Sequence, residues 1–186
     1  MNRIFRLLVP AAALALASTA AVAHPQAGAH AHSFLDGFAH PFTGIDHLLA
    51  MVAVGAWSAR QFNAQWLPPT FIGMVMVGMW SGAAGLTLPG LETGIALTVA
   101  VMGLLIALAA RLPAAGGAAL VGAFALLHGN AHGLELPAAS SAFGLLAAST
   151  LLVYGGRLLG RVGPALALKC VGAAIAATGL VLAAAL

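Results

Sequence analysis

The chain carries very little charge. Of its 186 residues, only 6% are Asp, Glu, Lys or Arg, whereas 62% are hydrophobic. An ordinary soluble domain has roughly 25% charged residues, and this chain has too few polar side chains to cover a water-soluble fold of its size. The seven Lys and Arg residues are scattered singly and form no basic patch. Their scatter excludes a nucleic-acid-binding surface.

Cysteine is also nearly absent. Cys170 is the single cysteine of the sequence, which excludes an internal disulfide framework and a cysteine-rich metal site. Apolar runs, in contrast, recur along the whole chain, and each is long enough to cross a hydrocarbon core of ~30 Å. The composition therefore predicts an all-α polytopic membrane protein that contacts the lipid bilayer.

The first residues have the pattern of a secretory signal peptide. Arg3 and Arg6 precede an apolar stretch at residues 7–16, and the small residues Ala21 and Ala23 flank Val22 as a cleavage site. We expect cleavage after Ala23; the alternative is an uncleaved anchor helix. The predicted organisation is a signal peptide at 1–23, a periplasmic His-rich arm at 24–42 and a transmembrane domain at 43–186.

Pro, Gly and charged residues divide the remaining chain into six predicted spans, which form one six-transmembrane-helix bundle. If the mature N-terminus is periplasmic, every basic residue left after cleavage falls on the cytoplasmic side, as the positive-inside rule requires. We therefore expect a multi-pass protein of the bacterial inner membrane. The spans are residues 43–59, 67–88, 93–111, 115–133, 139–158 and 164–185.

The first polar cluster lies at the entrance of the first predicted span. It contains His40, Asp46 and His47, with Pro41 placed to begin the helix. A carboxylate beside an imidazole is costly to bury in a membrane, so a functional role is the first interpretation. The alternative is an Asp–His pair that ties helices together. Met51 follows one turn below His47 as a weaker candidate soft ligand, with simple packing as its alternative.

The second cluster lies at the outer end of the fourth predicted span. His128 and His132 are four residues apart, so a helix presents both imidazoles on one face, as two ligands of a single ion require. Glu135 continues that face if the helix persists, although Gly133 predicts fraying there. Two such clusters in a chain with so few polar residues indicate a metal site.

The third cluster is the exported arm. His24 would offer both its ring nitrogen and the new terminal amine to a metal, and His30 and His32 add two weaker candidates. The arm is a candidate metal collector, and its alternative is a disordered polar tail.

This donor set indicates the class of ion. Neutral imidazole and carboxylate suit Ni²⁺, Co²⁺, Zn²⁺ and Cu²⁺, and suit Mg²⁺ or Ca²⁺ poorly. Binding should weaken below about pH 6, as imidazoles become protonated. Ligand chemistry alone leaves the choice among the four transition metals open.

The segments His40-Pro41-x-x-Gly44-x-Asp46-His47 and His128-Gly129-x-Ala131-His132-Gly133-x-Glu135 resemble those of the HupE/UreJ hydrogenase and urease accessory membrane proteins. The resemblance covers essentially the whole chain. It implies a nickel permease that supplies hydrogenase or urease maturation, and some members are thought to carry cobalt. A larger nickel/cobalt transporter family has His-x4-Asp-His, and the extra residue here would rotate a ligand on one continuous helix by about 100°.

We therefore expect an inner-membrane divalent-metal permease and not an enzyme. Ni²⁺ is the expected transported ion, with Co²⁺ or Zn²⁺ as alternatives, and no cofactor is expected to be permanently bound. Metallocentre-assembly proteins are candidate downstream partners. The other classes left open are an intramembrane metalloenzyme, which would need an open coordination site and a general base, and a haem-binding electron-transfer subunit.

Overall fold

The computed structural model describes residues 33–62 and 64–186. Within this part of the chain the secondary structure is seven α-helices and one short 3-10 helix, with no strand. The expected all-α class is confirmed. The helices are α2 (Phe34–Thr43), α3 (Ile45–Ser58), α4 (Leu67–Ala83), α5 (Leu91–Ala107), α6 (Ala114–Glu135), α7 (Ala139–Val162) and α8 (Ala165–Ala184), and the 3-10 helix η2 (Ala64–Trp66) precedes α4.

Helices α3 to α8 fall, in order, on the six ranges predicted as spans. Three of them, α6, α7 and α8, are long and apolar enough to cross a membrane by length and composition, whereas α3 and α5 are shorter apolar helices. The structure therefore supports membrane-type helices, and the count of six spans stays a prediction. Pro113 and Pro164 directly precede α6 and α8, where their fixed φ begins a helix without removing a needed donor.

Helix α2 was not predicted. It occupies the last part of the predicted arm, and a capping box begins it: the Ser33 hydroxyl accepts from the Asp36 amide, and the Asp36 carboxylate accepts from the Ser33 amide. Pro41, expected in the first turn of a span, lies instead near the end of α2. The expectation was wrong because the polar cap at Ser33 starts a separate helix earlier in the chain. The predicted signal peptide and residues 24–32 of the arm lie outside the described residues.

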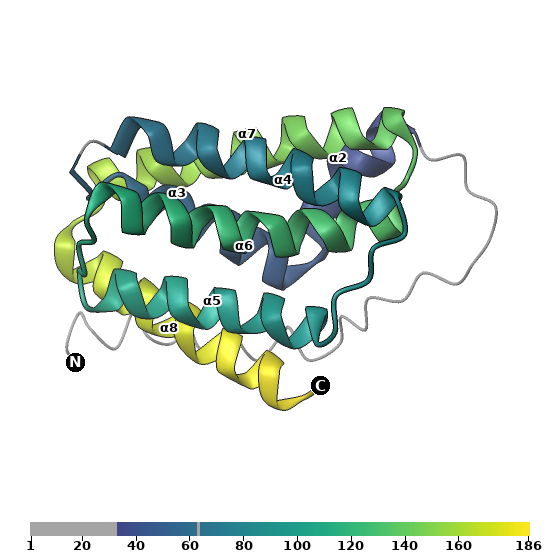
Figure 1. Cartoon of the computed structure of the whole chain (residues 1–186). Helices are drawn as coiled ribbons and strands as arrows, with labels where there is room; N and C mark the ends of the chain where they lie inside the picture. Colours follow the sequence, from purple (N-terminus) through teal and green to yellow (C-terminus); the bar gives the residue numbers. More distant parts are fainter. Residues whose placement is uncertain (1–32, 63) are drawn as a thin grey trace.

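The helices run along the long axis of the molecule (Figure 1), and α6 lies between α4 and α5 in this view. Glycines let α4 and α6 approach closely, as small residues do where membrane helices pack. A Cβ added to Gly129 or Gly133 would overlap the backbone carbonyl of Val75 or Met79. The backbones of the two helices are therefore in direct contact.

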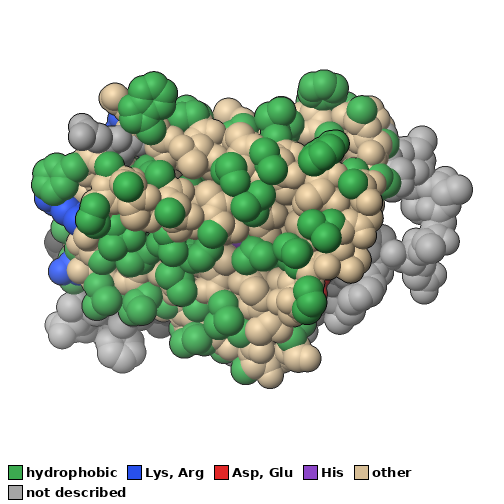
Figure 2. Space-filling view, in the orientation of Figure 1, with side chains coloured by type: hydrophobic (Ala, Val, Ile, Leu, Met, Phe, Trp, Pro, Cys, Tyr) green, Lys and Arg blue, Asp and Glu red, His purple; other side chains and the backbone are tan. Residues whose placement is uncertain are grey.

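The surface is largely hydrophobic, and its basic side chains gather at one end of the molecule, where α6 and α8 begin (Figure 2). Arg60 binds the end of α7 there, since its Nε donates to the Gly160 carbonyl at 2.6 Å and its guanidinium donates to the Gly163 carbonyl at 2.7 Å. Exposed leucines, valines and phenylalanines cover much of the rest. An apolar belt with charged side chains confined to the ends is what a bilayer requires.

Candidate metal site

Three helices bring the two predicted clusters together at one end of the bundle. His40 lies in the last turn of α2, Asp46 and His47 lie in the first turn of α3, and α6 supplies its last two turns. The members contributed by α6 are His128, His132 and Glu135. All six candidates of the two clusters therefore belong to one site, although up to 95 residues of sequence separate them.

The four imidazole rings are packed against one another. The ring centroids of His47 and His132 are 4.3 Å apart, and those of His47 and His128 are 5.1 Å apart. His40 lies on the other side of His132, with 5.1 Å between their ring centroids. The rings thus form a continuous row from His40 through His132 and His47 to His128, and we call these residues the His row.

The chain breaks between His40 and Asp46. Gly44 ends α2 and begins α3 with an extended backbone (φ −89°, ψ 113°). The two residues are therefore on different helices, and the rotation of about 100° expected on one continuous helix does not apply. The extra residue of the His-x5-Asp-His spacing is accommodated by this break.

Glycines also position α2 against the start of α7. A Cβ on Gly37 would overlap the Ser141 carbonyl, and one on Gly144 would overlap the Phe34 carbonyl. This contact holds α2 beside the bundle, which places His40 next to His132.

Helix α6, in contrast, does not fray at Gly133. It continues to Glu135, and the Leu136 amide still donates to the His132 carbonyl at 2.8 Å. The predicted fraying was wrong because Gly133 is packed against the Met79 carbonyl, where a glycine is needed for close approach and not for a turn. His128, His132 and Glu135 consequently share one face of an intact helix.

Two rings of the row have a fixed orientation. His47 Nδ1 donates to Asp46 Oδ1 at 2.8 Å, and His128 Nδ1 donates to the Phe124 carbonyl at 2.9 Å. Because carboxylate and carbonyl oxygens only accept, each neutral ring has its proton on Nδ1 and a lone pair on Nε2. Both Nε2 atoms are buried and have no hydrogen-bond partner within the described part of the chain. Metal-binding histidines are typically held in this way.

His132 lies between these rings and His40. Its side chain is fully buried, and neither ring nitrogen has a hydrogen-bond partner among the residues that the structure describes. A buried polar atom without a partner is costly. With the two Nε2 atoms of His47 and His128, the row holds four such nitrogens. One nitrogen on each of the three neutral rings has a lone pair that can bind a cation.

The end of the row nearest the surface has a carboxylate. His40 Nε2 lies 2.9 Å from Glu135 Oε2, and the two side chains are 26% and 49% exposed. One ligand atom from each of His40, His132 and Glu135 lies within 4.8 Å of the other two. These residues could hold a metal ion at the mouth of the site.

The weaker candidates are placed differently. Met51 is fully buried in the hydrophobic core cluster one turn beyond His47, which agrees with the packing alternative. His24, His30 and His32 lie outside the described residues. The role of the Phe124 carbonyl was not predicted, because a backbone acceptor has no sequence signal. Asn130 was not predicted either; its Nδ2 donates to Ser81 Oγ and to the Leu86 carbonyl, both at 2.9 Å, and ties α6 to the end of α4.

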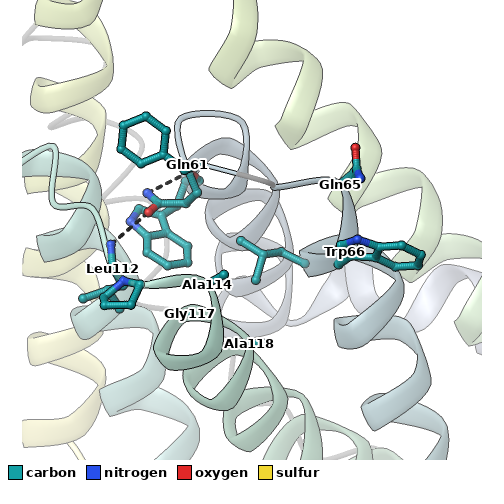
Figure 3. Close-up of a pocket in the computed structure, with 11 residues that line it drawn as sticks. Gln61, Gln65, Trp66, Leu112, Ala114, Gly117 and Ala118 are labelled. Atoms are coloured by element: carbon teal, nitrogen blue, oxygen red, sulfur yellow. Dashed lines mark hydrogen bonds between the residues drawn. The ribbon is translucent and has the colours of Figure 1, made fainter.

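A cavity of about 260 Å³ lies at the opposite, basic end (Figure 3). The Gln61 side chain beside it accepts from the Leu112 amide at 3.1 Å and donates to the Trp57 carbonyl at 3.4 Å. Among the residues that the structure describes, its lining contains no His, Asp or Glu. It therefore has none of the donors that make up the His row.

Comparison with known proteins shows the family to which the chain belongs. The sequence profile of the HupE / UreJ protein family matches residues 12–182. Protein HupE of Rhizobium leguminosarum bv. viciae is 47% identical over 148 residues, which cover 77% of this chain and 76% of that protein. No solved structure matches the chain. The match extends over most of the length of both proteins, and the chain belongs to the HupE/UreJ family.

Proposed function

We propose that the protein is an inner-membrane permease for a divalent transition-metal ion and that it imports nickel for hydrogenase or urease maturation. The observation that carries this proposal is the set of four buried ring nitrogens on His47, His128 and His132 without hydrogen-bond partners in the described chain. They lie inside an apolar helical bundle, where unpaired polar atoms are expensive and mark functional sites.

The donor set supports a borderline transition metal. Imidazole suits nickel, cobalt, zinc and copper, whereas magnesium and calcium prefer sites made of oxygen ligands. Glu135 is the single carboxylate next to His40 and His132 in the described cluster of candidate ligands. Affinity alone would favour copper over nickel, so the choice of nickel rests on membership of the HupE/UreJ family.

The arrangement supports passage of an ion over permanent binding. The donors extend from the half-exposed Glu135 to the fully buried His128, so an ion entering at the surface meets new ligands as it moves inward. A structural metal site, in contrast, is usually a closed set of four ligands.

The test is uptake of radioactive nickel by a nickel-starved bacterial host that lacks its own nickel transporters. Cells producing the wild type should accumulate nickel above the empty-vector level, and His47→Ala and Glu135→Gln should reduce uptake to that level. Asp36→Asn is the matched control, because it makes the same kind of carboxylate-to-amide change at an exposed residue of α2 outside the His row.

Protein amounts are equalised by immunoblot. If the wild type takes up no nickel, the nickel assignment is wrong, and cobalt and zinc uptake in the same cells decides whether the permease class survives. If Glu135→Gln and His47→Ala transport normally, the His row is not on the ion path.

A further inference from the structure

We infer that the His row contains two overlapping ion stations that share His132, so that an ion passes from one to the other by exchanging the remaining ligands. The mouth station is His40, Glu135 and His132, and the inner station is His47, His128 and His132. This inference rests on the proposed permease function and adds the route through the site.

The mouth station has the geometry of an ion site and is open to the surface. Ligand atoms of His40, His132 and Glu135 all lie within 4.8 Å of one another. His40 and Glu135 are partly exposed, at 26% and 49%. An ion arriving from solution can therefore reach these two side chains first and displace their mutual hydrogen bond.

The inner station is made of nitrogen donors and is closed to solvent. The Nε2 atoms of His47 and His128 are buried and unpartnered within the described residues, and their rings are 5.1 Å apart between centroids. Asp46 and the Phe124 carbonyl hold the opposite nitrogens, so neither ring can turn away without losing a hydrogen bond. Each ring is therefore held in one orientation with its Nε2 unpaired, as second partners hold metal-binding histidines.

His132 lies between the two stations. Its ring is 5.1 Å from that of His40 and 4.3 Å from that of His47, measured between centroids. Neither of its nitrogens is held by a hydrogen bond in the described chain, so this ring, unlike the rings of His47 and His128, is not committed to one direction.

A neutral imidazole has one lone pair available for coordination, because its other nitrogen carries the proton. His132 can consequently complete either station but not both at once. An ion bound at the mouth excludes a second ion at the inner station until the first has moved on. The stations are alternatives for binding and consecutive steps for transport.

This distinction gives a test by nickel binding to the purified full-length protein, measured by isothermal titration calorimetry. The reference protein carries His24→Ala, His30→Ala and His32→Ala and a purification tag without histidine, so that other imidazoles do not contribute. Glu135→Gln impairs the mouth station and His47→Ala the inner station. Each should lower the affinity by only about twofold if the stations are equally strong, because half of the binding modes remain.

The combined variant Glu135→Gln/His47→Ala and the single variant His132→Ala should each lower the affinity by about 100-fold or more, because both stations are then impaired. Size-exclusion chromatography and circular dichroism check that each variant is folded. If His132→Ala is not folded, the combined variant serves as the test. Its fold-loss of nickel affinity must far exceed the product of the fold-losses of the two single variants.

Uptake by cells supplies the second measurement. Both single variants should bind nickel nearly as well as the reference yet lose most of their uptake, because transport needs the stations in series. The inference is overturned if each single variant loses as much affinity as His132→Ala, which indicates one joint site. It is also overturned if either single variant keeps normal uptake. Failure of the unmodified protein to transport nickel would count against the permease function, while the binding results would still report on the stations.

Discussion

Among the described residues, the hydrogen bonds of the Asp46 carboxylate are to His47. Its Oδ1 accepts from both the ring Nδ1 and the backbone amide of His47, each at 2.8 Å. The carboxylate therefore fixes the ring proton and the ring direction, and the Nε2 atom of His47 has no such bond. We therefore expect Asp46 to act as a positioning residue, through His47, and not as a ligand.

Substituting Asp46→Asn keeps an acceptor for His47 Nδ1 but removes the negative charge and adds a competing amide donor. We expect nickel affinity to fall by about 10-fold to 100-fold, the usual effect of changing a group that orients a metal-binding histidine. Calorimetry of the purified protein measures this change, with Asp36→Asn as the control. Wild-type affinity in Asp46→Asn would show that Asp46 does not position the site.

Polar residues are so rare in this sequence that any cluster of them stands out, and this singled out six candidate site residues: His40, Asp46, His47, His128, His132 and Glu135. Their order in space was not predictable. The row depends on His132 lying between His40 and His47, and that contact joins residues far apart in the chain. Ligands could not be distinguished from positioning groups in the sequence either, because the hydrogen bonds to Asp46 and Phe124 depend on the folded side-chain geometry.

Two helix boundaries control the shape of the site. The break at Gly44 lets α2 leave the axis of α3, and the continuity of α6 through Gly133 keeps His132 and Glu135 on one face. From the sequence, Gly133 was predicted to fray the helix, and no role was predicted for Gly44. The sequence does not distinguish a glycine that ends a helix from a glycine that permits close packing, because the difference depends on the neighbouring helix.

The contact between α4 and α6 supports the ligands on α6. Gly133→Ala places a Cβ against the Met79 carbonyl, where the two backbones have no room for it. We expect this change to lower the free energy of unfolding by about 1–3 kcal/mol, as overpacking does. Thermal unfolding in detergent, followed by circular dichroism, measures the loss.

Gly73→Ala is the matched control, because it lies on α4 and an added Cβ meets nothing within 4 Å. It should unfold at or slightly above the wild-type temperature, because alanine is a better helix former than glycine. Equal midpoints for Gly73→Ala and Gly133→Ala would mean that α4 and α6 do not pack through Gly133.

The two ends of the molecule differ in their polar side chains. The His row lies where α2 and α6 end and α3 begins, and the Lys and Arg side chains gather at the opposite end (Figure 2). The six apolar ranges were predictable because Pro, Gly and charged residues interrupt the hydrophobic runs. Which faces would touch was not predictable, because almost every face is apolar and the sequence has no amphipathic pattern to orient the helices.

The position of the basic side chains predicts which end of the molecule is periplasmic. In a background with Cys170→Ala, Ala139→Cys at the start of α7 should react with a membrane-impermeant maleimide on intact spheroplasts, because it lies at the end that bears the His row. Val162→Cys, at the end of the same helix, should react only after the membrane is permeabilised. The reverse labelling pattern would place the His row on the cytoplasmic side and contradict import from the periplasm.

The most direct measurement is nickel flux through the purified protein in liposomes that enclose a nickel-sensitive fluorescent dye. The account predicts that nickel added outside changes the dye signal faster in liposomes with the wild-type protein than in empty liposomes. Liposomes with His132→Ala should match the empty ones. If folded wild-type protein, present at the same density, admits nickel, cobalt and zinc no faster than bare lipid does, the chain does not by itself conduct a metal ion, and the central claim is wrong.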